Sequence, residues 1–150
     1  MTVGFFFDTK TGDAPFYDGG DQLFSTTTLA TVGKGVVGAL THYKETKNRA
    51  VRIHDIGISQ KKVLEIGKKV APQKSWQGNL VKLEDVRAKS DAAIAAGNFD
   101  EHTVLIPYLF SAIWGKDYGG YYSSPDNELL GLGFKTEADV EAIIRAVIRA

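Results

Sequence analysis

The chain has 150 residues, of which 43% are hydrophobic and 24% charged, a composition that excludes disordered, collagen-like and coiled-coil proteins and favours a single domain over residues 1–150. Its 18 basic residues balance its 18 acidic ones, so it lacks the basic excess by which proteins bind nucleic acid regardless of sequence. Cysteine is absent, which excludes disulfides, thiolate metal ligands and a cysteine nucleophile.

Targeting and membrane signals are not found in the sequence. The apolar run at residues 3–7 is too short for a signal peptide, and no basic region precedes it. No stretch reaches the roughly 18 consecutive apolar residues that a bilayer span needs. We therefore expect a cytoplasmic protein with no membrane partner.

Apolar runs and turn residues in the first half of the chain predict short strands alternating with helices. The expected elements are strands at 4–7 and 14–17 joined by a turn at 9–13, a helix at 25–40, a strand at 49–58 and a helix at 59–70. Ser25 or Thr26 is the expected N-cap of the first helix, and Ser59 is that of the second. Pro72 stops the second helix, because proline cannot continue one.

The second half of the chain is predicted to be mainly helical. The expected elements are a strand at 76–81, helices at 83–96 and from residue 100, a glycine- and tyrosine-rich loop at 114–125, and a last helix from residue 136. Gly97 closes the first of these helices, Pro107 kinks the second, and Thr136 with Asp139 caps the third. The fold class is therefore α+β, with a small mixed sheet of three or four short strands packed with about five helices.

Three glycines in the 25–40 segment have the spacing of a dinucleotide-binding loop. Gly33, Gly35 and Gly38 match G-x-G-x-x-G, and Asp55 follows where an acid would bind a ribose. An apolar stripe at helical spacing nevertheless runs straight through these glycines, which favours one continuous helix with close-packed glycines. The stripe consists of Leu29, Val32, Val36, Val37 and Leu40. A nucleotide site remains the alternative interpretation.

Several runs resemble fungal NmrA-like, isoflavone-reductase-like proteins, which are atypical short-chain dehydrogenases. The runs are residues 16–33 (FYDGGDQLFSTTTLATVG), 36–38 (VVG), 46–49 (TKNR), 118–120 (YGG) and 126–132 (DNELLGL). They follow one another in the family's order over nearly the whole chain. Only the C-terminal half of the family is matched, so the resemblance implies a substrate-binding half without the Rossmann half, its glycine loop or the catalytic lysine of the reductases.

This resemblance has consequences for cofactor and partners. Without the nucleotide-binding half, we expect no cofactor and no standard hydride transfer. Elements that would pack on the missing half should expose apolar surface, and a patch above a few hundred Å² usually finds a partner. We therefore expect a homodimer, or a rearrangement of the first strands and helices that covers the gap.

The 114–122 segment carries most residues of the expected ligand site. It combines aromatic rings, phenol donors, a cation and a carboxylate with glycines, the mixture that substrate pockets use. The expected catalytic residues are Asp117 and Tyr118, and the expected substrate-binding residues are Tyr108, Trp114, Lys116, Tyr121 and Tyr122. The alternative is a surface loop whose tyrosines cover the core.

Two histidines are further candidates for acid–base catalysis. His54 ends a strand beside Asp55, but neighbours on a strand point to opposite faces and do not form a dyad with each other. His102 lies in the first turn of a helix, where a cation opposes the helix dipole, which favours a functional use. The three histidines of the chain lack the spacing of a metal site, so we expect no metal.

The sequence thus predicts a cofactor-independent protein that binds an apolar polycyclic or aromatic metabolite. By its resemblance to fungal enzymes, its reaction is expected to be a redox-neutral isomerisation or cyclisation in secondary metabolism, which needs positioning and preorganised donors. The alternatives are a non-catalytic regulatory or protein-interaction module, and an NAD(P)-dependent oxidoreductase or a fragment of one.

Overall fold

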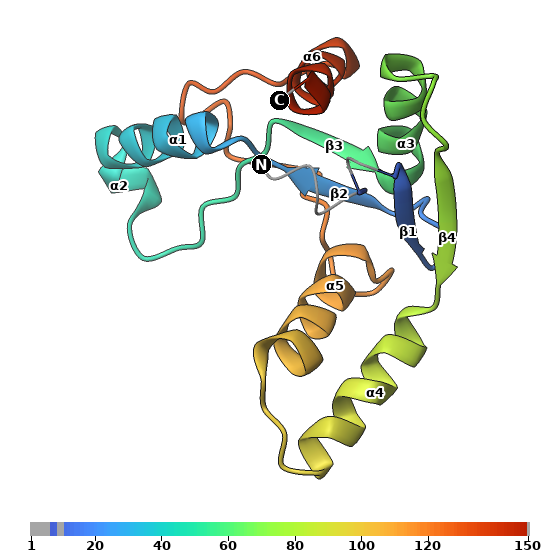
Figure 1. Cartoon of the computed structure of the whole chain (residues 1–150). Coiled ribbons are helices and arrows are strands. Elements are labelled where there is room, and N and C mark those ends of the chain that lie inside the picture. Colours follow the sequence, from blue (N-terminus) through green and yellow to red (C-terminus); the bar gives the residue numbers. More distant parts are fainter. Residues whose placement is uncertain (1–6, 9–10, 150) are drawn as a thin grey trace.

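The computed structural model describes residues 7–8 and 11–149, which form a mixed α+β fold (Figure 1). The strands are β1 (Asp13–Tyr17), β2 (Leu23–Thr26), β3 (Ile56–Ser59) and β4 (Gln77–Val81). The helices are α1 (Leu29–Thr41), α2 (Tyr43–Thr46), α3 (Gln60–Val70), α4 (Leu83–Ala95), the π-helical turn η2 (Glu101–Leu105), α5 (Ile106–Trp114) and α6 (Glu137–Arg149). The predicted fold class is confirmed.

The described strands form two small sheets rather than one. β1 pairs with β4 in parallel, from Asp13 opposite Gln77 to Tyr17 opposite Val81. β2 pairs with β3 in antiparallel orientation, with Leu23 opposite Ser59. The strand expected at 4–7 and its turn at 9–13 fall largely outside the described residues; among the described strands, β1 pairs with β4.

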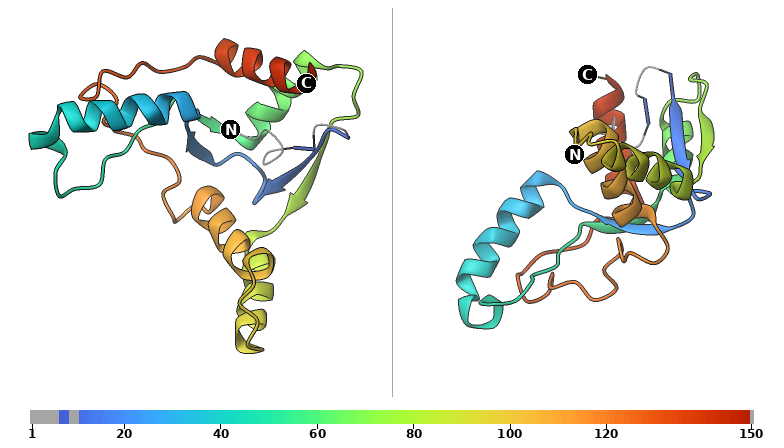
Figure 2. Two further views of the ribbon diagram at one scale, coloured as in Figure 1. Left: turned by 60° about the vertical axis from the view of Figure 1, so that its left-hand side comes forward. Right: turned by 90° about the horizontal axis from the view of Figure 1, so that it is seen from below.

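The arrangement of the helices leaves two projecting parts (Figures 1 and 2). Helices α3 and α6 lie side by side next to the β2–β3 sheet, whereas α1 with α2, and α4 with α5, extend away from the sheets. The core between sheets and helices is aromatic: the Trp114 ring stacks on Tyr17 at 4.7 Å and meets Phe24 edge-on at 6.0 Å. The α4–α5 projection is therefore anchored in this core, whereas α1 and α2 contribute no residue to it.

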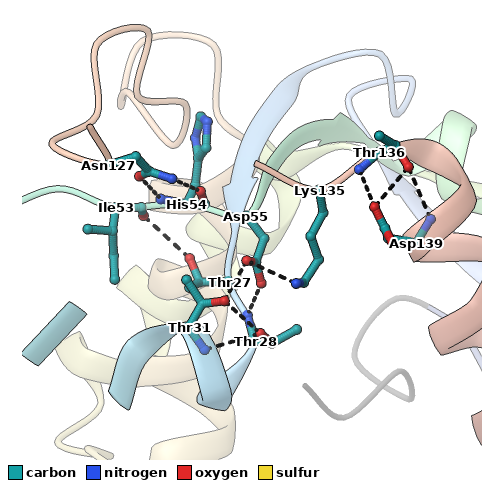
Figure 3. Close-up of polar contacts among 10 residues, drawn as sticks. All are labelled: Thr27, Thr28, Thr31, Ile53, His54, Asp55, Asn127, Lys135, Thr136 and Asp139. Atoms are coloured by element: carbon teal, nitrogen blue, oxygen red, sulfur yellow. Dashed lines mark hydrogen bonds and ion pairs between the residues drawn. The ribbon is translucent and has the colours of Figure 1, made fainter. Parts of the chain in front are cut away.

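Several elements follow from local signals, as the sequence predicts. Ser59 caps α3 by accepting from the backbone N–H of Lys62 at 3.3 Å. Gly97 follows α4 with a φ of +79°, a conformation that glycine adopts without strain. Thr136 and Asp139 bond reciprocally at the start of α6, through a Thr136 N–H to Asp139 Oδ2 bond of 2.7 Å (Figure 3).

Helix α1 begins later than the sequence predicts. Ser25 and Thr26 do not cap it, because both lie in β2, opposite Gly57 and Ile56 of β3. Thr28 is the N-cap instead, and its side chain accepts from the N–H of Thr31. The strand pairing keeps the chain extended through Thr26, so the helix can start only after it.

The predicted strand at 49–58 is also shorter, since only β3 joins a ladder. The preceding residues bond to a loop near position 126 instead. Arg52 O accepts from the Asp126 N–H at 2.6 Å, and the Asn127 amide bonds both the N–H and the C=O of His54 (Figure 3). The backbone of Arg52 and His54 is therefore bonded by a loop, whereas the N–H of Asp55 donates to Thr26 O of β2 at 2.9 Å.

The three glycines of the dinucleotide-like motif lie inside α1, and two of them, Gly35 and Gly38, serve close packing. A Cβ on Gly35 would come within 2.8 Å of Ile53 Cδ1, and one on Gly38 within 2.8 Å of Leu130 O. Their backbone is part of a continuous helix, so these glycines do not form a phosphate-binding loop. This arrangement agrees with the continuous-helix interpretation.

Candidate functional site

The α4–α5 pair is held together by polar contacts at several points. Asp18 Oδ1 accepts from the N–H of Leu83 at 3.0 Å and so binds the start of α4 to the end of β1. The buried Ser90 hydroxyl donates to the C=O of Thr103 at 2.9 Å, which joins α4 to η2. Asp100 caps η2 by accepting from His102 and Thr103. The start of α4 is thus bonded to the end of β1, and its middle to the η2 turn that leads into α5.

Between these helices and the following loop lies an open cleft of about 540 Å³. Its walls come from α4, from the end of α5 and from the 115–118 loop. The lining residues include Asp18, Glu84, Arg87, Asp91, Lys116, Asp117 and Tyr118. The cleft is therefore charged and aromatic rather than purely apolar, and it has the volume of a small-molecule site.

The central pair in the cleft is Arg87 with Tyr118. Arg87 Nη1 donates to the Tyr118 hydroxyl oxygen at 2.8 Å, and the guanidinium carbon lies 5.6 Å from the centre of the Tyr118 ring. Because the arginine is the donor, the O–H of Tyr118 is left to donate to another group. Tyr118 is 54% exposed, so this donor is accessible from the cleft.

A second tyrosine lies next to this pair. The Tyr108 hydroxyl donates to Asp91 Oδ1. The pKa of Tyr108 is raised above its usual value, first by this hydrogen bond and then by burial and the Asp91 charge. Tyr108 is therefore a neutral phenol that orients the Asp91 carboxylate beside the cleft.

Close approach of the backbone explains the glycines of the loop. A Cβ on Gly115 would lie 2.4 Å from Ser111 O, and one on Gly120 only 2.0 Å from Ile113 O. Any side chain at these positions would push the loop off the end of α5. The glycines thus allow the loop to fold back and place Tyr118 opposite Arg87.

The structure brings together four of the residues expected at the ligand site. Lys116, Asp117 and Tyr118 line the cleft, and Tyr108 contacts it through Asp91. Trp114 is the last residue of α5 rather than part of the loop, and its ring is buried in the core, where it is 1% exposed. Trp114 is therefore a core residue next to the loop, and its ring offers no surface to a ligand.

Arg87 and Asp91 are site residues that the sequence reasoning missed. They are four residues apart on α4, a spacing that places both on one face of a helix. This spacing is visible in the sequence, but only the helix pairing shows that the face meets the tyrosines of α5 and the loop.

His54 lies in a second cluster at the other end of the same loop. Its Nδ1 is 2.8 Å from Ser25 Oγ, which also accepts from the Tyr122 N–H at 2.9 Å. The Tyr121 ring stacks on the imidazole at 5.9 Å, and the imidazole is buried. Burial lowers the pKa of His54, an effect that the charge of Asp55 partly opposes. His54 is thus a neutral group that holds the loop, together with Tyr121 and Tyr122.

Asp55 points to the opposite side of the chain from His54, as expected for neighbours in an extended segment (Figure 3). Its carboxylate accepts from the Thr28 N–H and the Thr31 hydroxyl, each at 2.6 Å, and Lys135 Nζ lies 3.5 Å away. Burial acts to raise the pKa of Asp55, but the bonds from Thr31 and Thr28 and the Lys135 charge lower it overall. This carboxylate anchors α1 and is not free to bind a ribose.

His102 is not brought to either cluster. It lies exposed in η2 and is not among the residues lining the cleft. In the described part of the chain, no group of three or more His, Asp or Glu side chains is arranged to hold a metal ion. None of the described helices is long and apolar enough to cross a membrane.

Comparison with known proteins relates part of the chain to an oxidoreductase. Over 64 residues, or 43% of the chain, it is 42% identical to "Oxidoreductase poxI" of Penicillium oxalicum, and the same match is found for strain 114-2 of that fungus. The matched stretch covers 20% of the length of that relative. No family model matches the chain, and no solved structure matches it significantly. The chain is thus related, over this stretch, to a fungal oxidoreductase.

Proposed function

We propose that the chain is a cofactor-independent small-molecule-binding protein related to the NmrA-like proteins, and that its α4–α5 cleft binds an oxygenated aromatic metabolite. The observation that carries this proposal is the Arg87–Tyr118 pair, in which Arg87 is the donor and the Tyr118 O–H is left to donate at a cleft of about 540 Å³. A carbonyl or phenolate oxygen of a ligand is the natural acceptor for that donor.

The charges of the cleft refine the expected class of ligand. Arg87 and Lys116 supply cations, and Asp91 and Asp117 supply carboxylates, so a pure hydrocarbon would desolvate these groups without replacing their hydrogen bonds. A ring system with hydroxyl and carbonyl groups would satisfy them and would still stack on the tyrosine. We therefore assign an oxygenated aromatic molecule in place of a purely apolar one.

The same groups supply acid–base chemistry for a redox-neutral reaction. Tyr118 would donate to a ligand carbonyl, while the carboxylate of Asp117 or Asp91 would take a proton from the adjacent carbon and return it elsewhere. Such a proton transfer isomerises or cyclises a substrate without net oxidation. It requires positioned donors and acceptors, which the α4–α5 pair provides.

Calorimetric titration tests the binding proposal. The probe is a hydroxyacetonaphthone, compared with ethylnaphthalene, which has a similar shape but no oxygen. The oxygenated probe should bind, and Tyr118→Phe should weaken it about tenfold, the effect of one lost hydrogen bond. Tyr122→Phe is the matched control, since Tyr122 lies at the other end of the loop. Equal binding of the two probes, or an equal effect of the two variants, would contradict the proposal.

A second candidate function is an NAD(P)-dependent oxidoreductase, or a part of one, and the name of the matched relative favours it. Under this alternative the chain would bind NADPH or NADP⁺, and titration with each would release or absorb heat at micromolar concentration. The glycines of α1 would not form the nucleotide site, because they lie within a helix. A measured affinity for either nucleotide would favour this function over the first.

A further inference from the structure

Helix α1 has its amphipathic character reversed. The side that it buries against the chain carries small or polar residues, namely Thr31, Gly35 and Gly38. The opposite side carries the large apolar ones, with Leu29 79%, Val36 56% and Leu40 70% exposed. A helix whose outer side met only water would have the reverse pattern. The outer face of α1 therefore has the composition of a surface that packs against another protein surface.

This outer face, formed by Leu29, Val32, Val36, Val37 and Leu40, is large enough for a specific interface. At their observed exposures these five side chains present on the order of 500 Å² of apolar surface, in the upper part of the range for the largest patch on a monomer. Two such faces together would bury on the order of 1,000 Å², the lower bound for a specific interface.

The face is also complementary to itself. In an antiparallel pair with a twofold axis between positions 34 and 35, Leu29 meets the partner's Leu40 and Val32 meets the partner's Val37. Val36 then lies over the partner's Gly33, and nothing lies within 4 Å of a Cβ built on Gly33. The projecting Val36 side chain of each copy thus fits the space at Gly33 of the other copy, as a self-complementary twofold contact requires.

Charge does not oppose such a contact. Within α1, all of which the structure describes, Lys34 is the one charged residue. The whole chain carries no net charge, so two copies do not repel each other. An acidic or basic partner, by contrast, would find little on this face to pair with.

From these observations we propose that two copies of the chain form a dimer through the outer faces of their α1 helices. This inference is independent of the ligand proposed for the cleft, since α1 and the α4–α5 pair project in different directions (Figure 1). Sedimentation equilibrium over a concentration series tests it. Wild-type protein should be dimeric at tens of micromolar.

The variants Val36→Glu and Leu40→Glu should each raise the dissociation constant at least ~100-fold, because each copy would bury an unpaired carboxylate. The matched control is Leu80→Glu, because Leu80 of β4 is 70% exposed, the same fraction as Leu40. Circular dichroism checks that every variant keeps its helix content. A monomeric wild type would overturn the proposal and would indicate that a different partner binds this face. A dimer whose dissociation constant neither α1 substitution changes would also overturn it.

Cross-linking provides a second measurement that needs no charged residue in the interface. The chain has no cysteine, so Gly33→Cys and Val36→Cys chains can be mixed and oxidised without background. The mixed disulfide between the two variants should form faster than the disulfide of a Leu80→Cys control. Equal rates would contradict the antiparallel arrangement.

Discussion

Replacing Asp55 by asparagine should destabilise the fold strongly, although the change removes only a charge and keeps the shape. The two carboxylate oxygens of Asp55 accept separately: Oδ2 from the Thr28 N–H and Oδ1 from the Thr31 hydroxyl. An asparagine has one acceptor oxygen, so its NH₂ group must face one of these sites. Lys135 also loses its nearby anion. With hydrogen bonds to a buried charge contributing about 1.5–3 kcal/mol each, we expect a loss of about 2–3 kcal/mol.

Urea unfolding at neutral pH measures this loss, with Asp21→Asn as the matched control. Asp21 also pairs with a lysine, Lys61, at 2.6 Å, but its side chain is 74% exposed, so its loss should cost less than about 0.5 kcal/mol. Because the pKa of Asp55 is lowered in the folded state, its contribution is complete above the unfolded pKa of about 3.9. It is lost as the pH falls further. The free energies of unfolding of the wild type and of Asp55→Asn, plotted against pH, should therefore converge below about pH 4. Equal stability of Asp55→Asn and Asp21→Asn at neutral pH would refute this reasoning.

Two further changes probe α1 and the His54 cluster. Gly38→Ala should lower the free energy of unfolding by about 1–3 kcal/mol, because the new Cβ would meet the Leu130 backbone. Gly35→Ala should lower it by less than about 1 kcal/mol, because its Cβ would meet only the end of the Ile53 side chain. Chemical unfolding measures both variants, and a larger loss for Gly35→Ala would show the packing argument to be wrong. Burial lowers the pKa of His54 despite the Asp55 charge, so folding stability should fall as the pH drops below the unfolded value of about 6.5. The loss between pH 7.5 and pH 5 should shrink in His54→Gln, and an unchanged loss there would assign it to other groups.

Elements with local signals were predictable from the sequence. Ser59 before α3, Gly97 after α4, and Thr136 with Asp139 at α6 each satisfy backbone groups within a few residues, so their structural effect does not depend on the rest of the fold. The opposite directions of His54 and Asp55 were also predictable, because they follow from the geometry of any extended segment.

The features that the sequence did not predict depend on distant partners. Thr26 looks like a helix cap until its pairing with Ile56 is known, and this pairing spans thirty positions of the chain. The bonds from Asn127 to the backbone of His54 likewise replace a strand ladder that local propensity favours. For the candidate site, the tyrosines were recognised by their chemistry, whereas Arg87 was missed because its role appears only when α4 packs beside the loop.

The extended segment that contains His54 and Asp55 connects the two projecting parts of the molecule. On one side, Asp55 bonds the first turn of α1 through Thr28 and Thr31. On the other, the His54 ring lies against Ser25 and Tyr121, and so holds the far end of the loop that carries Tyr118. Under the proposed function, we therefore expect His54 to act on the cleft through the position of the loop. The groups that would contact a ligand are Tyr118 and the charged side chains around it, all at the α4–α5 end.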